Sequence, residues 1–128
     1  MFMSVLLAVN GTLMRGLELC KNMEDAGAEF VKEDATAPCY RLWSVNDNNP
    51  AMLKVKEGGV SVHLEVWEVP EAGLADILKK EPPGLSIGKV QLKDGSYVLG
   101  VIAEPWVVEG MKDISQFQGW RSYIASKA

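Results

Sequence analysis

Two short segments of the chain carry residue types suited to holding and protonating a small ligand. The first is Asn10-Gly11-Thr12-Leu13, which follows an apolar run. A strand that ends in a glycine-containing turn can expose successive backbone N–H groups, and such groups bind a carboxylate or a developing oxyanion. Most Asn-Gly turns only reverse the chain, so simple chain reversal is the alternative interpretation.

The second segment is Glu81-Pro82-Pro83-Gly84, which follows a predicted helix. Two prolines and a glycine restrict the backbone tightly, which suits a carboxylate that must point in one direction. In a semi-apolar pocket the pKa of such a carboxyl rises, and the group can then transfer a proton. The alternative is a solvated glutamate at the end of a helix.

Other candidates are a histidine–glutamate pair and two arginines. His63 and Glu65 lie two residues apart on a predicted strand and could act as ligands, or as a base with its orienting partner. A solvated strand face is the favoured interpretation, since alternation sends polar side chains outward. Arg15 and Arg41 could pair with an anionic ligand or simply be solvated. The remaining aromatic candidates are interpreted as core or subunit-contact residues: Trp43, Trp67, Trp106 and Trp120.

The elements that must position these residues are mostly strands. Alternation and turn residues predict strands over 4–9, 29–36, 40–45, 52–56 and 60–69, a hairpin of 87–92 with 97–103, and irregular strand over 105–109. The strand over 60–69 turns Val60, Val62, Leu64 and Val66 to one face and Ser61, His63, Glu65 and Trp67 to the other.

Helical spacing predicts helices over 17–26 and 71–80, and a short C-terminal helix interrupted or capped at Gly119. The middle helix has acidic Glu71 at its start, lysines at its end, and a buried stripe of Leu74, Ile77 and Leu78. Strands with flanking helices predict one α+β domain over residues 1–128, built as a small mixed β-barrel with flanking helices.

Composition excludes several classes of function. The 128 residues carry a formal charge of -4, which argues against a nucleic-acid binder and against polybasic membrane contact. The apolar N-terminal residues predict a buried strand rather than a signal peptide, no stretch can span a bilayer, and a cytoplasmic location is expected. Cys20 and Cys39 are expected as free thiols, with a disulfide left open. With one histidine, no Cys/His cluster and no nucleotide-binding motif, we expect no metal and no cofactor.

The order of segments along the chain resembles a known family. The strand and its Asn-Gly-Thr-Leu turn are followed by the segments Ala37-Pro38-Cys39-Tyr40-Arg41-Leu42, Leu64-Glu65-Val66-Trp67-Glu68-Val69-Pro70, Glu81-Pro82-Pro83-Gly84-Leu85 and Gly119-Trp120-Arg121-Ser122-Tyr123. Together they resemble the C-terminal domain of allophanate hydrolase, in the γ-glutamylcyclotransferase-like group, over nearly the whole chain. The resemblance implies the group's small mixed barrel with flanking helices.

The resemblance also implies a site. The group's signature turn is Tyr-Gly-Ser-Leu, which here reads Asn10-Gly11-Thr12-Leu13, and Glu81 falls where the group's catalytic glutamate is expected. In the cyclotransferases that glutamate relays a proton from the substrate's amine as the amine attacks the γ-carbonyl, while the amides of the turn hold the substrate. The substrate-binding residues expected here are the four of the turn together with Tyr40, Arg41, Pro83 and Gly84. Asn10 replaces the tyrosine, which favours the allophanate branch over γ-glutamyl cyclisation.

Three functional hypotheses follow. The first is an enzyme acting on a small anionic or amide metabolite, namely an amide, carbamate or N-carboxylated compound, in urea- or allophanate-type nitrogen metabolism. Because the amidase domain of allophanate hydrolase is missing, we expect a stand-alone homologue that works beside a separate amidase or performs a related reaction. The second is a non-catalytic assembly module that docks an amidase partner or forms a homodimer through exposed tryptophans. The third is a γ-glutamyl cyclotransferase.

Overall fold

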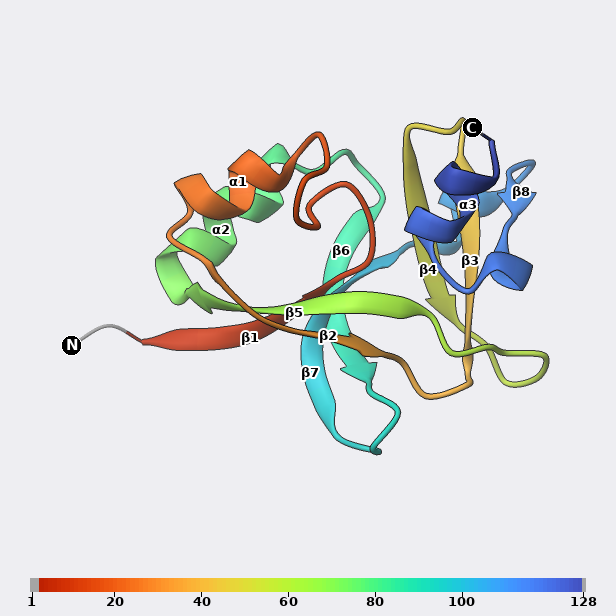
Figure 1. Ribbon diagram of the computed structural model, residues 1–128, viewed down its shortest axis with the longest axis horizontal. Helices are drawn as coiled ribbons and strands as arrows, with labels where there is room; N and C mark the ends of the chain where they lie inside the picture. The colour runs from red at the N-terminus through yellow and green to blue at the C-terminus, as the bar shows by residue number, and fades with distance from the viewer. Residues whose placement is uncertain (1–2, 128) are drawn as a thin grey trace.

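The computed structural model describes residues 3–127, which form two sheets with helices packed around them (Figure 1). The larger sheet has the strand order β2-β5-β1-β7-β6, with bounds Glu29–Ala35, His63–Pro70, Ser4–Val9, Tyr97–Ala103 and Leu85–Gln91. The smaller sheet has the order β4-β3-β8, with bounds Asn49–Lys54, Tyr40–Val45 and Lys112–Asp113. Met1, Phe2 and Ala128 belong to the predicted domain but lie outside the described residues.

Strand β5 lies inside the larger sheet, where it pairs antiparallel with β1 on one side and β2 on the other. Val62, Leu64 and Val66 are buried as predicted. The prediction of a solvated opposite face is wrong for Glu65, which is only 1% exposed, whereas Trp67, at 4% exposed, lies in the core, which was one of its two interpretations. A strand flanked on both edges and covered on both faces buries both sets of side chains. The strand also begins at His63, because Val60 forms only an isolated bridge with Tyr40.

Helices α1 (Cys20–Asp25) and α2 (Glu71–Lys80) lie side by side over the larger sheet (Figure 1). Gly73 permits their close approach, because a Cβ built on it would lie 2.2 Å from the carbonyl oxygen of Ala26. Helix α2 has the predicted bounds, whereas α1 is shorter than predicted. Ile77 is buried, but Leu78 is 37% exposed, so the buried stripe of α2 is narrower than predicted.

The C-terminal segment covers the smaller sheet. It contains helix α3 (Trp120–Ser126) after a short 3-10 turn, η2 (Ser115–Phe117), so the interruption at Gly119 is confirmed. Another 3-10 turn, η1 (Pro105–Val108), replaces the irregular strand predicted over 105–109. Proline suits the first position of a helical turn, since its fixed φ is helical and its missing N–H has no partner there.

The two edges of the larger sheet meet at one end. Thr36, just after β2, forms an antiparallel bridge with Leu92, just after β6. The N–H of Ala37 donates to the carbonyl of Gln91, and the N–H of Lys93 to the carbonyl of Ala35, both at 3.0 Å. The α+β class with mixed sheets and flanking helices is therefore confirmed. The ladder of described residues is not continuous around the sheet, so a closed barrel stays a prediction.

Candidate functional site

A cavity of about 20 Å³, which we call the inner cavity, lies between the end of β1 and the end of α2. Its lining residues are Val9, Asn10, Gly11, Thr12, Leu13, Asn49, Pro50, Glu81, Leu85 and Val101. The space suffices for about one water molecule or one ligand oxygen. The structure thus brings the predicted turn and the predicted carboxylate to one hollow, although 68 positions separate Leu13 from Glu81 (81 − 13).

The Asn10–Leu13 turn is held firmly from both sides. The side-chain amide of Asn10 donates to the carbonyl oxygen of Val101 at 3.0 Å and contacts the sulfur of Met52 at 3.8 Å. The ring of Pro50 packs on Gly11, where a Cβ would lie 2.5 Å from the proline Cδ. The turn therefore requires glycine at this position, and the Asn10 amide group anchors the turn to the sheets.

The turn carries polar hydrogens that the protein does not use. Within residues 3–127, the backbone N–H groups of Gly11, Thr12 and Leu13 donate to no protein acceptor. The hydroxyl of Thr12 also has no protein partner in that range, and it is open to solvent, because no buried side-chain oxygen of the described residues lacks a hydrogen-bond partner. Successive unused N–H groups beside a cavity are suited to binding an oxygen atom of a ligand.

Glu81 directly follows helix α2 and lines the inner cavity. Its backbone is extended, with φ -77° and ψ 148°, because the following proline disfavours helical geometry. Burial raises the pKa of its carboxyl group. No described side chain forms a hydrogen bond with this carboxyl, so it is free to exchange a proton with a bound molecule.

An open groove of about 450 Å³, which we call the outer groove, adjoins the inner cavity. Thr12, Asn49 and Glu81 line both spaces. The other lining residues are Glu18, Leu19, Asp47, Asn48 and Pro82. A molecule larger than one water would therefore lie in the outer groove and reach the turn with one protruding atom.

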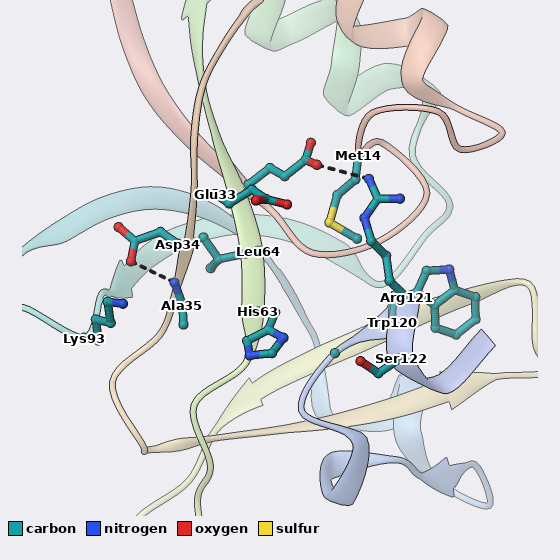
Figure 2. Close-up of a pocket in the computed structure, with 12 residues that line it drawn as sticks. Met14, Glu33, Asp34, Ala35, His63, Leu64, Lys93, Trp120, Arg121 and Ser122 are labelled. Carbon is teal, nitrogen blue, oxygen red and sulfur yellow. Dashed lines mark hydrogen bonds and ion pairs between the residues drawn. The ribbon is translucent and has the colours of Figure 1, made fainter. Parts of the chain in front are cut away.

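A second hollow of about 450 Å³ lies between β2, β5 and the start of α3 (Figure 2). Its lining shares no residue with the inner cavity or the outer groove. In Figure 2, Arg121 and Ser122 lie on the right-hand side, and His63 lies to the left of them. Glu65 forms part of the floor. Its carboxylate accepts hydrogen bonds from the backbone N–H and Nε of Arg15, the indole N–H of Trp67 and Nη2 of Arg121.

The Glu65 carboxylate is thus fully occupied by protein donors. Burial acts to raise the pKa of Glu65, but the hydrogen bonds from Arg15, Trp67 and Arg121 hold the pKa below its usual value. A carboxylate in this state has no lone pair left to orient His63, so the predicted base-and-orienter pair does not form. The sequence reasoning missed Arg121 altogether, because a partner 56 positions away from Glu65 leaves no local signal.

Comparison with known proteins gives the family. The model of the allophanate hydrolase C-terminal domain matches residues 5–125. The chain belongs to this family. The resemblance drawn from the Asn-Gly-Thr-Leu and Glu-Pro-Pro-Gly segments is confirmed.

The chain is similar to both short and long proteins. A crystal structure of a uropathogenic Escherichia coli-specific protein is 54% identical, with TM-score 0.95, over 96% of this chain and 97% of that one. Kluyveromyces lactis allophanate hydrolase is 29% identical, with TM-score 0.93, over 98% of this chain but 22% of that one. Urea amidolyase of Lachancea kluyveri is 30% identical over 94% of this chain, which spans only 7% of that protein.

The fold extends beyond the allophanate hydrolase family. An AIG2-like protein of Mus musculus shares 23% identity and a TM-score of 0.61, over 81% of this chain and 78% of that one. This likeness shows a common fold and supports the expected relation to γ-glutamylcyclotransferase-like structures.

Four of the residues expected to bind substrate in this family member lie away from the inner cavity and the outer groove. The hydroxyl of buried Tyr40 accepts the N–H of Gln91 at 3.0 Å, and Arg41 pairs with Asp113 at 2.9 Å. Pro83 is exposed, and Gly84 packs beside Trp106. Tyr40 and Arg41 are therefore committed to other partners, whereas Pro83 and Gly84 adjoin Glu81 in the chain without lining the inner cavity or the outer groove. Pro82, Asn49 and Pro50 line the site instead, and the sequence reasoning did not single out the last two.

Three further findings concern the part of the chain that the structure describes. It contains no group of three or more histidine, cysteine, aspartate or glutamate side chains that could hold a metal ion. None of its helices has the length and apolar character needed to cross a membrane. Both cysteines are free thiols in the structure, Cys20 buried and Cys39 partly exposed.

Proposed function

We propose that this domain acts on a small amide, carbamate or N-carboxylated compound, with Glu81 as general acid and base. The observation that carries the proposal is the meeting, at one cavity, of the unused N–H groups of the Asn10–Leu13 turn with the carboxyl of Glu81. Donors fixed before the reaction stabilise negative charge that develops on an oxygen atom. A carboxyl with a raised pKa transfers protons more effectively near neutral pH.

The roles of the two parts are complementary. A carbonyl oxygen of the ligand enters the inner cavity and accepts hydrogen bonds from the turn. Glu81 then takes or gives the proton on the neighbouring nitrogen, which lies at the mouth of the outer groove. Family membership supports a place in urea- or allophanate-type nitrogen metabolism, since relatives carry the names allophanate hydrolase and urea amidolyase.

The test is release of ammonia from a panel of small amides, carbamates and N-carboxylated compounds. Glu81→Gln should lower turnover by about 100-fold or more, because general acid–base catalysis contributes about 10²–10⁴-fold. Glu71→Gln, at the exposed start of the same helix, is the matched control and should turn over as the parent protein does. Equal turnover by the Glu81→Gln variant would exclude this mechanism.

A second candidate function is assembly with an amidase partner or with another copy of the chain. It is favoured by Trp106, whose side chain is 55% exposed on η1, and by the longer relatives in which this domain is one part. Exposed tryptophan is typical of contact surfaces. Light scattering and co-purification with an amidase test this function, and a Trp106→Ser variant should lose the association. A strictly monomeric protein that captures no amidase contradicts it.

A further inference from the structure

We propose that Trp106 is a positioning residue for Glu81, because its indole ring packs against the turn that follows Glu81 and thereby fixes where this carboxyl group lies at the inner cavity. The inference rests on the proposed function, to which it adds a residue outside the lining of both spaces. Three features carry it: the stiffness of the turn, its contact with η1, and the half-exposed position of the indole.

The turn that follows Glu81 is stiff. The N–H of Leu85 donates to the carbonyl of Pro82 at 3.3 Å, and Gly84 has a φ of 94°. A proline in the second position of a four-residue turn and a glycine of positive φ in the third are typical of a type II turn. The two prolines also fix their own φ angles, and Pro82 keeps Glu81 extended. Glu81 and the turn therefore move together, so a contact that holds the turn also holds Glu81.

The 3-10 turn η1 holds this segment at Gly84. The carbonyl of Gly84 accepts the N–H of Glu104, which precedes η1, at 2.8 Å. A Cβ built on Gly84 would lie 2.3 Å from Cγ2 of Val107 and 2.8 Å from Cζ2 of Trp106, so both side chains are in close contact with the glycine backbone. The next residue, Leu85, lines the inner cavity. The segment after Glu81 therefore joins η1 to the candidate site.

The indole of Trp106 is itself held in one orientation. Its N–H donates to Oε1 of Glu104 at 2.8 Å, so the residue whose backbone binds Gly84 also fixes the ring through its side chain. Trp106 is 55% exposed, and no residue of η1 is buried. Replacing Trp106 therefore removes a contact with the turn rather than a part of the hydrophobic core, and its effect on Glu81 can be measured in a folded protein.

The titration of Glu81 reports where its carboxyl group lies. Burial raises the pKa of this group. Glu81 is the sole ionisable residue among the described residues that line the inner cavity, and the outer groove adds Glu18 and Asp47, of which Asp47 forms an ion pair with Lys127. If the turn moves outward and exposes the carboxyl group to solvent, the pKa of Glu81 falls towards 4.5, the ordinary value for a glutamate.

Carboxyl ¹³C titrations of the parent and three variants test the inference. Trp106→Ala should lower the Glu81 midpoint towards 4.5, whereas Trp106→Phe, which keeps an aromatic ring beside Gly84, should stay near the parent. Tyr97→Ala is the matched control and should leave the midpoint unchanged, because Tyr97 is 54% exposed and lines neither space. An unchanged Glu81 midpoint in Trp106→Ala overturns the inference. An equal movement of the Glu65 midpoint also overturns it, since that result would show a general loosening of the fold.

Dilution tests whether a second molecule, rather than the turn, keeps Glu81 buried. The Glu81 midpoint of the parent should be the same at low and at high protein concentration, because the contact between Trp106 and Gly84 lies within one chain. A midpoint that falls on dilution would assign the burial of Glu81 to association and overturn the inference.

Turnover separates this inference from the proposed function. Trp106→Ala should lower kcat for ammonia release by about 10- to 100-fold, because misplacing a reacting group by about 1 Å costs about 100-fold, and KM should stay within about threefold. If Glu81→Gln turns over as the parent does while Trp106→Ala still lowers the Glu81 midpoint, the proposed function fails and the positioning of this carboxyl stands. If Glu81→Gln abolishes turnover and Trp106→Ala leaves the midpoint unchanged, the proposed function stands and this inference fails.

Discussion

Glu65 binds Arg15 twice: its Oε1 accepts the backbone N–H at 2.9 Å, and its Oε2 accepts the side-chain Nε at 3.1 Å. Arg15 follows the Asn10–Leu13 turn by two positions, whereas Glu65 lies inside the larger sheet. Arg121 reinforces the contact by donating to both the Glu65 carboxylate and the Arg15 carbonyl. The segment that leaves the functional turn is therefore fixed to the centre of the sheet and to the C-terminal helix.

Replacing Glu65 by alanine should destabilise the fold. The change removes the acceptor of the buried indole N–H of Trp67, which costs about 1–3 kcal/mol, whereas the guanidinium groups of Arg15 and Arg121 are 45% exposed and can bind water instead. Urea denaturation at pH 7 measures the loss. Glu33→Ala is the control, because Glu33 pairs with the same Arg15 but its side chain is 74% exposed. The control should change the free energy of unfolding by less than about 1 kcal/mol, and an equal loss in both variants would contradict the structural role of Glu65.

The two glutamates should titrate in opposite directions. Hydrogen bonds lower the pKa of Glu65, although burial opposes them, and burial raises the pKa of Glu81. Carboxyl ¹³C shifts followed from pH 2 to 8 should place the Glu65 midpoint below 4.5, the ordinary value for a glutamate, and the Glu81 midpoint above it. Midpoints in the reverse order would refute the electrostatic description of both sites.

These pKa shifts fix the sign of two contributions to stability. Because the folded pKa of Glu65 is depressed, its contribution is present above the unfolded pKa and is lost as the pH falls through the folded pKa. Because the folded pKa of Glu81 is raised, its contribution is present below the unfolded pKa and is lost as the pH rises through the folded pKa. Urea denaturation should therefore find Glu81→Gln at least as stable as the parent at pH 7, and a marked loss would count against burial as the cause.

Gly11→Ala should strain the turn. The added methyl group would lie 2.5 Å from Cδ of Pro50, and overpacking of this kind costs about 1–3 kcal/mol. Thermal unfolding of Gly11→Ala, Pro50→Ala and the double variant forms a cycle that isolates the clash. The double variant should recover most of the loss caused by Gly11→Ala. If the losses of stability caused by Gly11→Ala and Pro50→Ala are strictly additive, the introduced methyl group does not clash with the Pro50 ring.

Gly73→Ala should also destabilise the protein, against the usual trend for helices. Alanine is normally favoured over glycine inside a helix by about 1 kcal/mol. At this position the new methyl group would lie 2.2 Å from the carbonyl oxygen of Ala26 and force α1 away from α2. Chemical denaturation measures the balance. Stabilisation by Gly73→Ala would mean that the two helices separate easily.

Local sequence signals predicted the bounds of an element best where residues at its two ends favour starting and stopping it. Helix α2 has its predicted bounds because Glu71 and the two lysines match the helix dipole and the double proline stops the helix. The burial of Glu65 was not predictable from alternation, since its neutralising partners Arg15 and Arg121 come from distant segments. Alternation shows only that one face of a strand carries polar residues. Contacts with residues from distant segments decide whether that face is exposed to solvent.

Some residues of the candidate site were likewise predictable from the sequence, and others were not. The turn and Glu81 were found from residue types, backbone restriction and family resemblance, and the structure brings them to one cavity. Asn49 and Pro50 were missed because they fall between the strands predicted over 40–45 and 52–56, and only the packing of Pro50 on Gly11 brings them to the site. Tyr40 and Arg41 were expected in the site, but their positions on β3 commit them to Gln91 and Asp113.

The bridge between Thr36 and Leu92 has a consequence for behaviour in concentrated solution. An unpaired edge strand is a template on which further chains can add and aggregate. Strand β2 is an edge strand of the larger sheet. Just after its end, Thr36 pairs with Leu92 of the same chain, and near its start the pairing of β2 with β5 has a register shift between Phe30 and Lys32. The stretch left open is short and carries Lys32, Glu33 and Asp34, whose charges deter recruitment of a second molecule into the sheet.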